Sequence, residues 1–163
     1  MRKKKIYLDT SVISYLRQED APTEMRDTLD FWEILKAGKY DVYISEVVID
    51  ELSSCAEPKR TELFALLEEI EYTNVKVKGN DAVAALEAKV NKLGVLPPKS
   101  ESDRFHIAVA VHIECNIIVS WNFKHMVNVK TIDGVRMVCL ENHITPVDIY
   151  TPTVLLEGRL SDG

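Results

Sequence analysis

Acidic residues recur in this chain where a strand is expected to end or a helix to start, and carboxylates so placed can bind cations or move protons. Asp9 follows the apolar run 6–8 and precedes two hydroxyl residues, Thr10 and Ser11. In parallel α/β sheets, ligands and chemistry gather at the carboxyl ends of the strands. Asp9 is therefore a candidate functional acid, although an ordinary turn or N-cap residue has the same appearance.

Glu51 falls within the apolar side of a helix that we expect over residues 46–55. At about 100° per residue, Glu46 and Asp50 project together from the opposite, polar side. Glu51 is thus a partly buried acid in need of a partner, whereas Glu46 and Asp50 need only water. The alternative is an edge position, from which the carboxylate reaches solvent or a lysine.

Asp103 and Asn122 complete the set of candidate site residues. Asp103 stands in the first turn of an apolar and therefore central helix, which we expect to follow Ser102. A cap at Ser102 and the helix dipole also explain an acid at this position. Asn122 follows a buried strand over residues 117–120, as Asp9 follows its own strand, and an ordinary turn is the alternative for it.

If strands and helices alternate as expected, these four residues share one rim of the sheet. Acids crowded together repel one another, and a hard divalent cation held by oxygen ligands, Mg²⁺ or Mn²⁺, relieves that repulsion. Such a site activates water and stabilises charge on a phosphoryl group. The pattern predicts metal-assisted phosphodiester hydrolysis by Asp9, Glu51, Asp103 and Asn122.

The elements that must position these residues are short apolar strands separated by amphipathic helices. This alternation predicts a mostly parallel sheet covered on both faces, which is a three-layer α/β/α sandwich. We expect one domain over residues 1–163, with the tail 141–163 packed on it as irregular structure and a short helix. The expected strands cover residues 6–9, 41–45, 72–77, 117–120 and 135–140.

Charge and composition restrict the class of protein. The formal net charge of -6 argues against a generally basic nucleic-acid coat but leaves room for a local basic patch. The three cysteines lack metal-binding spacing and indicate free thiols in a reducing compartment. The apolar stretches are too short for a membrane helix. We therefore expect a cytoplasmic protein without a membrane partner.

Four segments resemble, in the same order, the motifs of PIN-domain ribonucleases, a family that includes the toxins of type II toxin–antitoxin modules. The resemblance implies a five-stranded sheet of order 3-2-1-4-5, a metal-dependent endoribonuclease and often a homodimer. An RNA substrate and an antitoxin partner are implied as well. The four segments are Tyr7–Ile13, Ile44–Leu52, Ser102–Ala110 and Val119–His125.

The resemblance also implies roles for single residues. Asp9 and Asp103 would bind Mg²⁺ or Mn²⁺, while Glu51 would bind it or take the proton of the attacking water. Asn122 stands where the family often has an aspartate, which removes one negative charge from the site. Hydroxyls that would support these acids belong to Thr10, Ser11 and Ser120, and the candidate RNA contacts are Lys3, Lys4, Lys5, Lys99 and Lys124.

Two other functions remain open from the sequence. A phosphatase of the haloacid-dehalogenase type also opens with a strand and an aspartate, but it expects a second acid at the position of Ser11. A non-catalytic module that keeps the fold and binds RNA or a protein is the second alternative. Incubation with RNA in the presence of metal or of EDTA separates this module from a nuclease.

The remaining polar and aromatic residues near the motifs are expected to be structural. His106 and His112 lie on an apolar helix and are interpreted as core residues, whereas His125 is interpreted as a surface residue. Arg104 is a candidate partner for one of the acids. Trp121 is expected to pack in the core rather than to stack on a base.

Overall fold

A five-stranded sheet forms the centre of the protein in this computed structural model, which describes residues 2–161. All neighbouring strands are parallel, and their order is β3-β2-β1-β4-β5, which confirms the predicted sheet of order 3-2-1-4-5. Residues 1, 162 and 163 of the predicted domain 1–163 lie outside the described residues. The strands are β1 (Lys5–Leu8), β2 (Asp41–Ser45), β3 (Thr73–Val75), β4 (Ile117–Val119) and β5 (Asp148–Tyr150).

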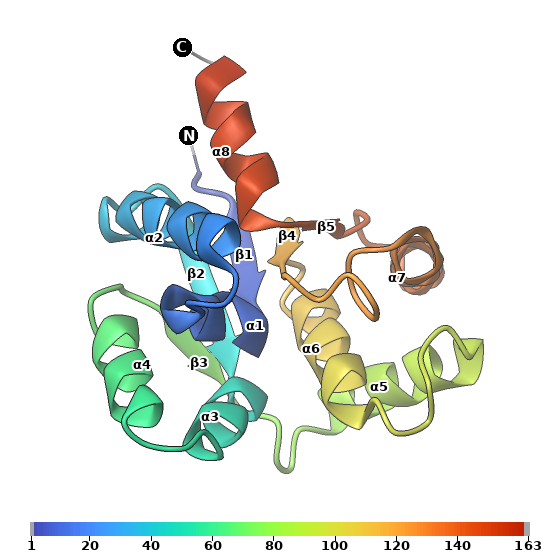
Figure 1. Ribbon diagram of the computed structural model, residues 1–163. Helices are drawn as coiled ribbons and strands as arrows, with labels where there is room; N and C mark the ends of the chain where they lie inside the picture. The colour runs from blue at the N-terminus through green and yellow to red at the C-terminus, as the bar shows by residue number, and fades with distance from the viewer. Residues whose placement is uncertain (1, 162–163) are drawn as a thin grey trace.

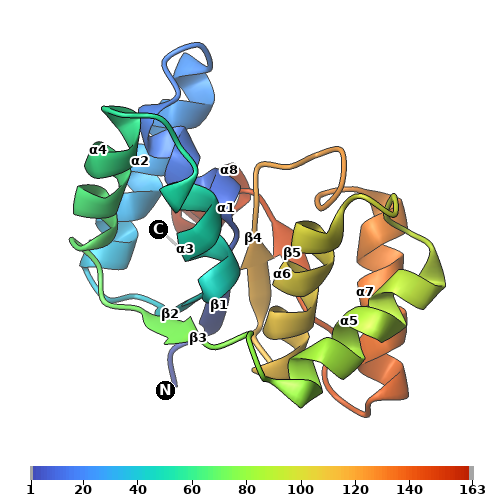
Figure 2. The same ribbon diagram turned by 90° about the horizontal axis from the view of Figure 1, so that it is seen from below.

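Helices cover both faces of this sheet, as predicted for a three-layer sandwich (Figures 1 and 2). One side carries α1 (Thr10–Ser14), a 3-10 turn (Tyr15–Arg17), α2 (Pro22–Lys36), α3 (Glu46–Ser53), α4 (Lys59–Leu67) and α8 (Pro152–Ser161). The other side carries α5 (Asp81–Leu93), α6 (Glu101–His112) and α7 (Val129–Glu141). Among residues 2–161, none of the helices is both long and apolar enough to cross a membrane.

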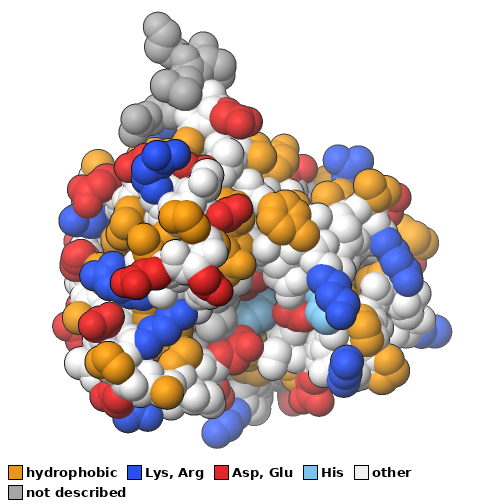
Figure 3. All heavy atoms as spheres, in the orientation of Figure 1, with side chains coloured by type: hydrophobic (Ala, Val, Ile, Leu, Met, Phe, Trp, Pro, Cys, Tyr) orange, Lys and Arg blue, Asp and Glu red, His pale blue; other side chains and the backbone are white. Residues whose placement is uncertain are grey.

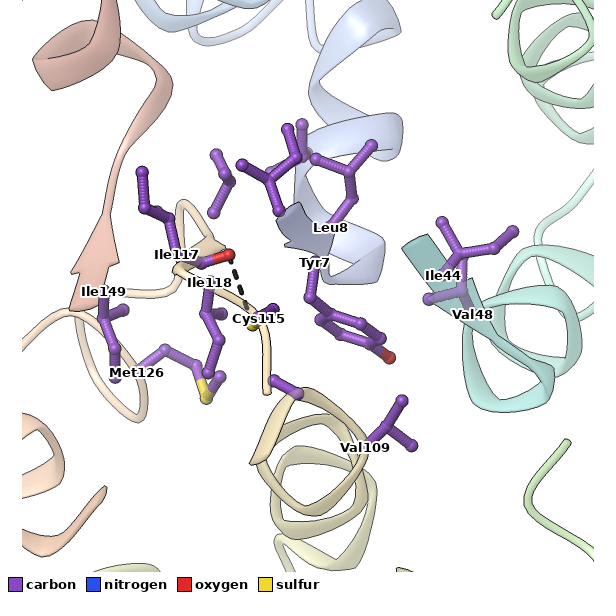
Figure 4. Packing of buried hydrophobic residues seen from close by; sticks show 14 of the residues in the cluster. Tyr7, Leu8, Ile44, Val48, Val109, Cys115, Ile117, Ile118, Met126 and Ile149 are labelled. Atoms are coloured by element: carbon purple, nitrogen blue, oxygen red, sulfur yellow. Dashed lines mark hydrogen bonds between the residues drawn. The ribbon is translucent and has the colours of Figure 1, made fainter. Parts of the chain in front are cut away.

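The core lies on both faces of β1, the middle strand of the sheet. Ile6, Tyr7 and Leu8 are fully buried, and the neighbouring β4 is buried along its whole length. A strand covered on both faces needs an unbroken apolar sequence, which explains why alternation of polar and apolar residues is absent here. Figure 4 shows the Tyr7 side chain extending from β1 between Val109 of α6 and Val48 of α3.

The strand predicted at Val135–Leu140 is wrong, because these residues belong to α7. The side chain of Asn128 caps this helix by accepting the N–H of Thr131 at 2.9 Å. Within the helix, Val135 and Cys139 are buried at a spacing of four residues, which is a helical period. The β-branched residues suggested a strand, and the fifth strand instead lies in the tail as β5.

The parallel register brings the carboxyl ends of β1 and β4 together. Leu8 pairs with Val119, and the N–H of Asp9 donates to the carbonyl of Val119 at 3.3 Å. The residues that follow the two strands are therefore neighbours in space, although more than a hundred positions separate them. At the same rim, β2 passes directly into α3, which carries Glu51.

Candidate active site at the carboxyl rim of the sheet

Asp9 lies directly behind the surface of this rim and is only 3% exposed. Its Oδ1 accepts hydrogen bonds from the N–H and hydroxyl of Ser11, and its Oδ2 accepts from the hydroxyl of Ser120. Asp9 is also the N-cap of α1, so the ordinary capping role expected for it is present too. Burial raises the pKa of Asp9 and outweighs the opposing effects of His106 and of the two hydroxyls.

The two serines that hold Asp9 also fasten the loop after β4. Ser11 Oγ accepts the N–H of Trp121 at 2.9 Å, and Ser120 Oγ accepts the N–H of Asn122 at 3.0 Å. The hydroxyls predicted to support Asp9 therefore contact it directly and join the segments that follow β1 and β4. This arrangement fixes the carboxylate of Asp9 before any ligand binds.

Glu51 reaches the same rim from α3, with 37% of its side chain exposed. Its Oε1 accepts hydrogen bonds from Thr10 Oγ1 and from His106 Nε2, both at 2.7 Å. Burial favours a raised pKa for Glu51, but the bond and charge of His106 together with the Thr10 bond hold that pKa below its usual value. Glu46, predicted to need only water, accepts the backbone N–H of Val77.

Asp103 stands in the first turn of α6, as expected, although this helix begins at Glu101 and Ser102 does not cap it. The Oδ2 of Asp103 accepts a hydrogen bond from His125 Nδ1 at 3.0 Å. Both side chains are 19% exposed. His125, interpreted from the sequence as a surface residue, is therefore mostly enclosed and hydrogen-bonded to a site acid.

Asn122 lies in the loop after β4, at the edge of the site. Its Oδ1 accepts the backbone N–H of His125 at 3.0 Å, so the amide oxygen shapes the turn that carries this histidine. Within the described residues, no hydrogen bond is recorded for the side-chain N–H₂ of Asn122. That group is left to donate to a ligand, and it is not a cation ligand.

The charges of the three acids meet at His106, which is 2% exposed. Burial lowers the pKa of His106, but its bond with Glu51 and the charges of the three carboxylates outweigh burial and raise that pKa. Asp103 also raises the pKa of Asp9, which places these two carboxylates within electrostatic reach of each other. The structure therefore brings together Asp9, Glu51 and Asp103, and Figure 3 shows acidic and histidine side chains gathered near the middle of this face.

His106 is the site residue that sequence reasoning missed. It was interpreted as a satisfied core residue, and it is buried and bonded, but its partner is a site acid. The spacing contained a signal, because His106 lies three positions after Asp103 and so shares a face of α6 with it. His112, also interpreted as a core residue, is exposed.

The site acids could bind a cation only if water molecules supplied some of its ligands. Among residues 2–161, no three His, Cys, Asp or Glu side chains are arranged so that they could hold a metal ion by themselves. Mg²⁺ usually keeps several waters and takes one or two protein carboxylates. Burial is the main cause of the raised pKa of Asp9, and the charge of Asp103 adds to it, so a cation shared by these two carboxylates would stabilise the ionised form of Asp9.

The predicted basic contacts fall into two groups. Lys99 directly precedes Ser100, whose hydroxyl lies 3.4 Å from Nδ1 of His125, and Lys124 directly precedes His125. Both lysines are exposed and lie beside the site along the chain. The other three, Lys3, Lys4 and Lys5, lie at the amino end of β1, whereas Asp9 follows the carboxyl end of the same strand.

Two pockets mark the two ends of the sheet. A pocket of about 270 Å³ borders Glu51 and is lined on either side by Val47 of α3 and Phe105 of α6. A larger pocket, of about 600 Å³, lies at the amino end and is lined by Lys3 and Tyr72 among others. Volume does not identify the site, because a pocket of the same volume, about 600 Å³, also lies beside α4; the acids that are hydrogen-bonded to histidines lie at the carboxyl end.

Arg104 and Trp121 have structural partners. Arg104 Nε forms a 2.8 Å ion pair with Glu87, outside the site, rather than with one of the site acids. Trp121 packs as expected: it is 6% exposed, stacks on Tyr15 with ring centroids 5.6 Å apart, and donates to Thr28. These contacts fix the positions of α6 and of the loop after β4, which carry site residues.

Comparisons with known proteins bear on the fold and the family of this chain. No curated protein matches the chain. Among solved structures, the chain is similar to VapBC2 from Rickettsia felis bound to a DNA fragment from their promoter, with a TM-score of 0.57 and 14% identity. That match covers 90% of this chain and 98% of the other, and at this identity it shows the fold. A family model for the PIN domain matches residues 6–124, which contain every candidate acid, and the chain therefore belongs to the PIN domain family.

Proposed function

We propose that this protein is a metal-dependent endoribonuclease that hydrolyses phosphodiester bonds in RNA, with Mg²⁺ or Mn²⁺ as cofactor. PIN domains are generally nucleases, and membership of that family supports the reaction class. The observation that carries the proposal is the convergence of three carboxylates at one rim, where their charges act on a single histidine. The charge of Asp103 also raises the pKa of Asp9, which links these two carboxylates electrostatically.

In this proposal, Asp9 and Asp103 would hold the cation, and Glu51 is the general base that accepts the proton of the attacking water. A divalent cation bound here supplies positive charge against the scissile phosphate and lowers the pKa of a water. Glu51 has one oxygen, Oε2, that is free of the bonds made by Thr10 and His106. With its pKa held low, Glu51 is ionised at neutral pH, and Oε2 accepts the proton of the attacking water.

The non-catalytic module remains the second candidate function, and Asn122 is the residue that favours it. Because this residue is an amide, the site offers three carboxylates where the family often has four, and the amide oxygen already accepts the His125 N–H. The haloacid-dehalogenase interpretation is replaced by the PIN assignment. At the position where that enzyme type needs an acid, Ser11 instead donates to Asp9.

We further propose that the protein is a toxin with an antitoxin partner, acts in the cytoplasm and forms a homodimer. The likeness to the chain of the VapBC2 structure supports the antitoxin partner. The free thiols of Cys55, Cys115 and Cys139 fit a reducing compartment. Coexpression with the product of an adjacent small gene tests the partner, and loss of RNA cleavage in the copurified complex is the supporting result.

Substitution of Asp9 by asparagine tests the nuclease directly. The Asp9→Asn protein should cleave a labelled single-stranded RNA about 100-fold more slowly, since loss of a charged ligand removes roughly 3 kcal/mol of transition-state stabilisation. EDTA should abolish cleavage by the wild type, and Mg²⁺ or Mn²⁺ should restore it. Equal rates for the two proteins would show that the cleavage arises elsewhere, and a wild type that binds RNA without cleaving it would support the module.

Charge reversal tests where the RNA lies. Lys99→Glu and Lys124→Glu should each weaken RNA binding and lower the slope of log affinity against log salt by about one unit, because each lysine is expected to contact one phosphate. Fluorescence anisotropy with a labelled RNA at several salt concentrations measures both quantities. Lys4→Glu is the matched control at the amino end of β1. If Lys4→Glu weakens binding as much as Lys124→Glu, the RNA path does not lie where we place it.

A further inference from the structure

His106 is bonded through both ring nitrogens, although the proposed reaction assigns it no role. Nε2 lies 2.7 Å from Glu51 Oε1, and Nδ1 lies 2.6 Å from Tyr7 Oη. The imidazole is 2% exposed, so water has almost no access to it. A ring bonded at both ends in a closed space keeps one orientation, and Nε2 is consequently directed at Glu51.

The bonds continue beyond Tyr7 into the sheet. Tyr7 Oη lies 2.8 Å from Ser45 Oγ, and Ser45 Oγ accepts the N–H of Val47 at 3.3 Å. Tyr7 and Ser45 are fully buried. Ser45 is the last residue of β2 and the N-cap of α3, the helix that carries Glu51. One chain of hydrogen bonds therefore joins β1, the start of α3 and α6, the three elements around Glu51.

When His106 is neutral, the donors and acceptors of this chain match in number. Burial raises the pKa of Tyr7 well above its usual value, so its hydroxyl keeps its proton. With a neutral imidazole, the Ser45 hydroxyl donates to Tyr7 and the Tyr7 hydroxyl donates to His106 Nδ1. With a protonated imidazole, Nδ1–H donates to Tyr7 Oη, and the Tyr7 hydroxyl donates to Ser45 Oγ instead. In both states Nε2–H donates to Glu51, so the contact with Glu51 does not depend on titration.

The consequence for Glu51 is that one oxygen is occupied and the other is left for chemistry. Oε1 receives both donors, His106 Nε2 and Thr10 Oγ1, at 2.7 Å each. Because 37% of the Glu51 side chain is exposed, packing alone leaves it several rotamers. The donor from His106 comes from a buried, immobile ring and selects one of them.

We infer that His106 is a positioning residue for RNA cleavage: anchored by Tyr7 and Ser45, it orients Glu51 so that Oε2 faces the attacking water. This inference rests on the proposed nuclease function. It goes beyond the PIN assignment, because His106 contacts neither the phosphate nor the cation and acts through Glu51 alone. Geometry of this kind affects the rate of the chemical step rather than substrate binding.

The test compares His106→Leu, which removes the donor, with His106→Gln, whose amide N–H₂ can still donate to Glu51. His106→Leu should lower kcat about 10- to 100-fold with KM within about twofold, a range typical of residues that orient a catalytic group. His106→Gln should recover most of that loss. Tyr7→Phe, which removes only the anchoring hydroxyl, should show a smaller loss of kcat. His112→Leu and His112→Gln, on the exposed side of the same helix, are the matched controls and should match the wild type.

Two readouts separate positioning from a structural role. The affinity for Mn²⁺, measured by calorimetry, should stay within about twofold of wild type in His106→Leu, because Asp9 and Asp103 are intact. A crystal structure of that variant should show Glu51 displaced or in several conformers. If His106→Leu and His106→Gln lose kcat equally, or if the loss follows Mn²⁺ affinity or melting temperature, the inference is overturned.

The two proposals fail in different ways. A wild-type protein that cleaves no RNA refutes the nuclease, whereas the crystal structures still show whether His106 orients Glu51. An active enzyme in which Glu51 keeps its conformation and kcat without His106 refutes the positioning role alone. His106→Gln also guards against misfolding, since a folded, active His106→Gln protein shows that the site tolerates a change at this position.

Discussion

Asp9 and Glu51 belong to one site, but the fold holds them in opposite ways. Asp9 is 3% exposed and is held by the neutral hydroxyls of Ser11 and Ser120, together with one backbone N–H. Glu51 has 37% of its side chain exposed and is held by Thr10 and by an imidazole. All the hydrogen bonds to Asp9 therefore come from neutral groups, whereas Glu51 is bonded directly to an imidazole that can carry positive charge.

This difference pushes the two pKa values apart. Burial dominates at Asp9 and raises its pKa, whereas His106 and Thr10 overcome burial at Glu51 and lower its pKa. A carboxylate that is buried and short of positive charge favours a cation, and one that stays ionised can accept a proton. Pairs of acids with separated pKa values commonly divide the work of a site in this way.

Removing the Ser120 hydroxyl that donates to Asp9 should have the largest effect among the tests of this comparison. Ser120→Ala leaves Oδ2 of Asp9 without its donor and frees the loop after β4, so the cleavage rate should fall about 10- to 100-fold. Single-turnover cleavage of a labelled RNA at saturating Mg²⁺ measures this change.

The matched change at Glu51 is Thr10→Val, which removes a hydroxyl and keeps the shape. Glu51 retains the His106 bond, so the rate should fall only about fivefold, as expected for about 1 kcal/mol from one hydrogen bond. An equal or larger loss in Thr10→Val than in Ser120→Ala would contradict the difference that we draw between the two carboxylates.

A smaller effect should appear in the pH dependence of stability. Glu51 has a lowered pKa and His106 a raised one, so their pairing stabilises the fold fully between their ordinary values of 4.5 and 6.5. The attraction between the two charges is lost as pH falls through the lowered pKa of Glu51 or rises through the raised pKa of His106, although a neutral imidazole still donates its Nε2–H to Glu51. Urea unfolding of Glu51→Gln should therefore show its greatest deficit relative to wild type in that window.

Asp9→Asn should show the opposite sign in the same experiment. Because the folded-state pKa of Asp9 is raised from 3.8, its charge destabilises the fold at neutral pH, and the penalty disappears as pH falls. Asp9→Asn should thus be at least as stable as wild type at neutral pH, with the gap closing in acid. A destabilised Asp9→Asn protein at neutral pH would show that the hydrogen bonds from Ser11 and Ser120 to the carboxylate outweigh the cost of burying it.

The positions of the acids along the chain were readable from the sequence, because they depend on local rules. Strands followed by an acid and hydroxyls, an acid on the apolar side of a helix, and an acid in a first helical turn predicted three residues that the fold brings together. The parallel sheet followed from the alternation of elements. The Val135–Leu140 error has a local cause, since β-branched residues fit a strand and a buried helix alike.

The partners of those acids were decided only by the tertiary structure. Ser120 reaches Asp9 across 111 positions, His106 reaches Glu51 across 55, and Tyr7 reaches His106 across 99. Sequence periodicity reports which face of an element is buried, but it does not report which buried groups meet. A change of a few tenths of an ångström in the donor–acceptor distance weakens a hydrogen bond, and the packing of β1, α3 and α6 sets those distances. The chain therefore determined by itself where its acids stand, while their surroundings, and with them their separated pKa values, came from the fold.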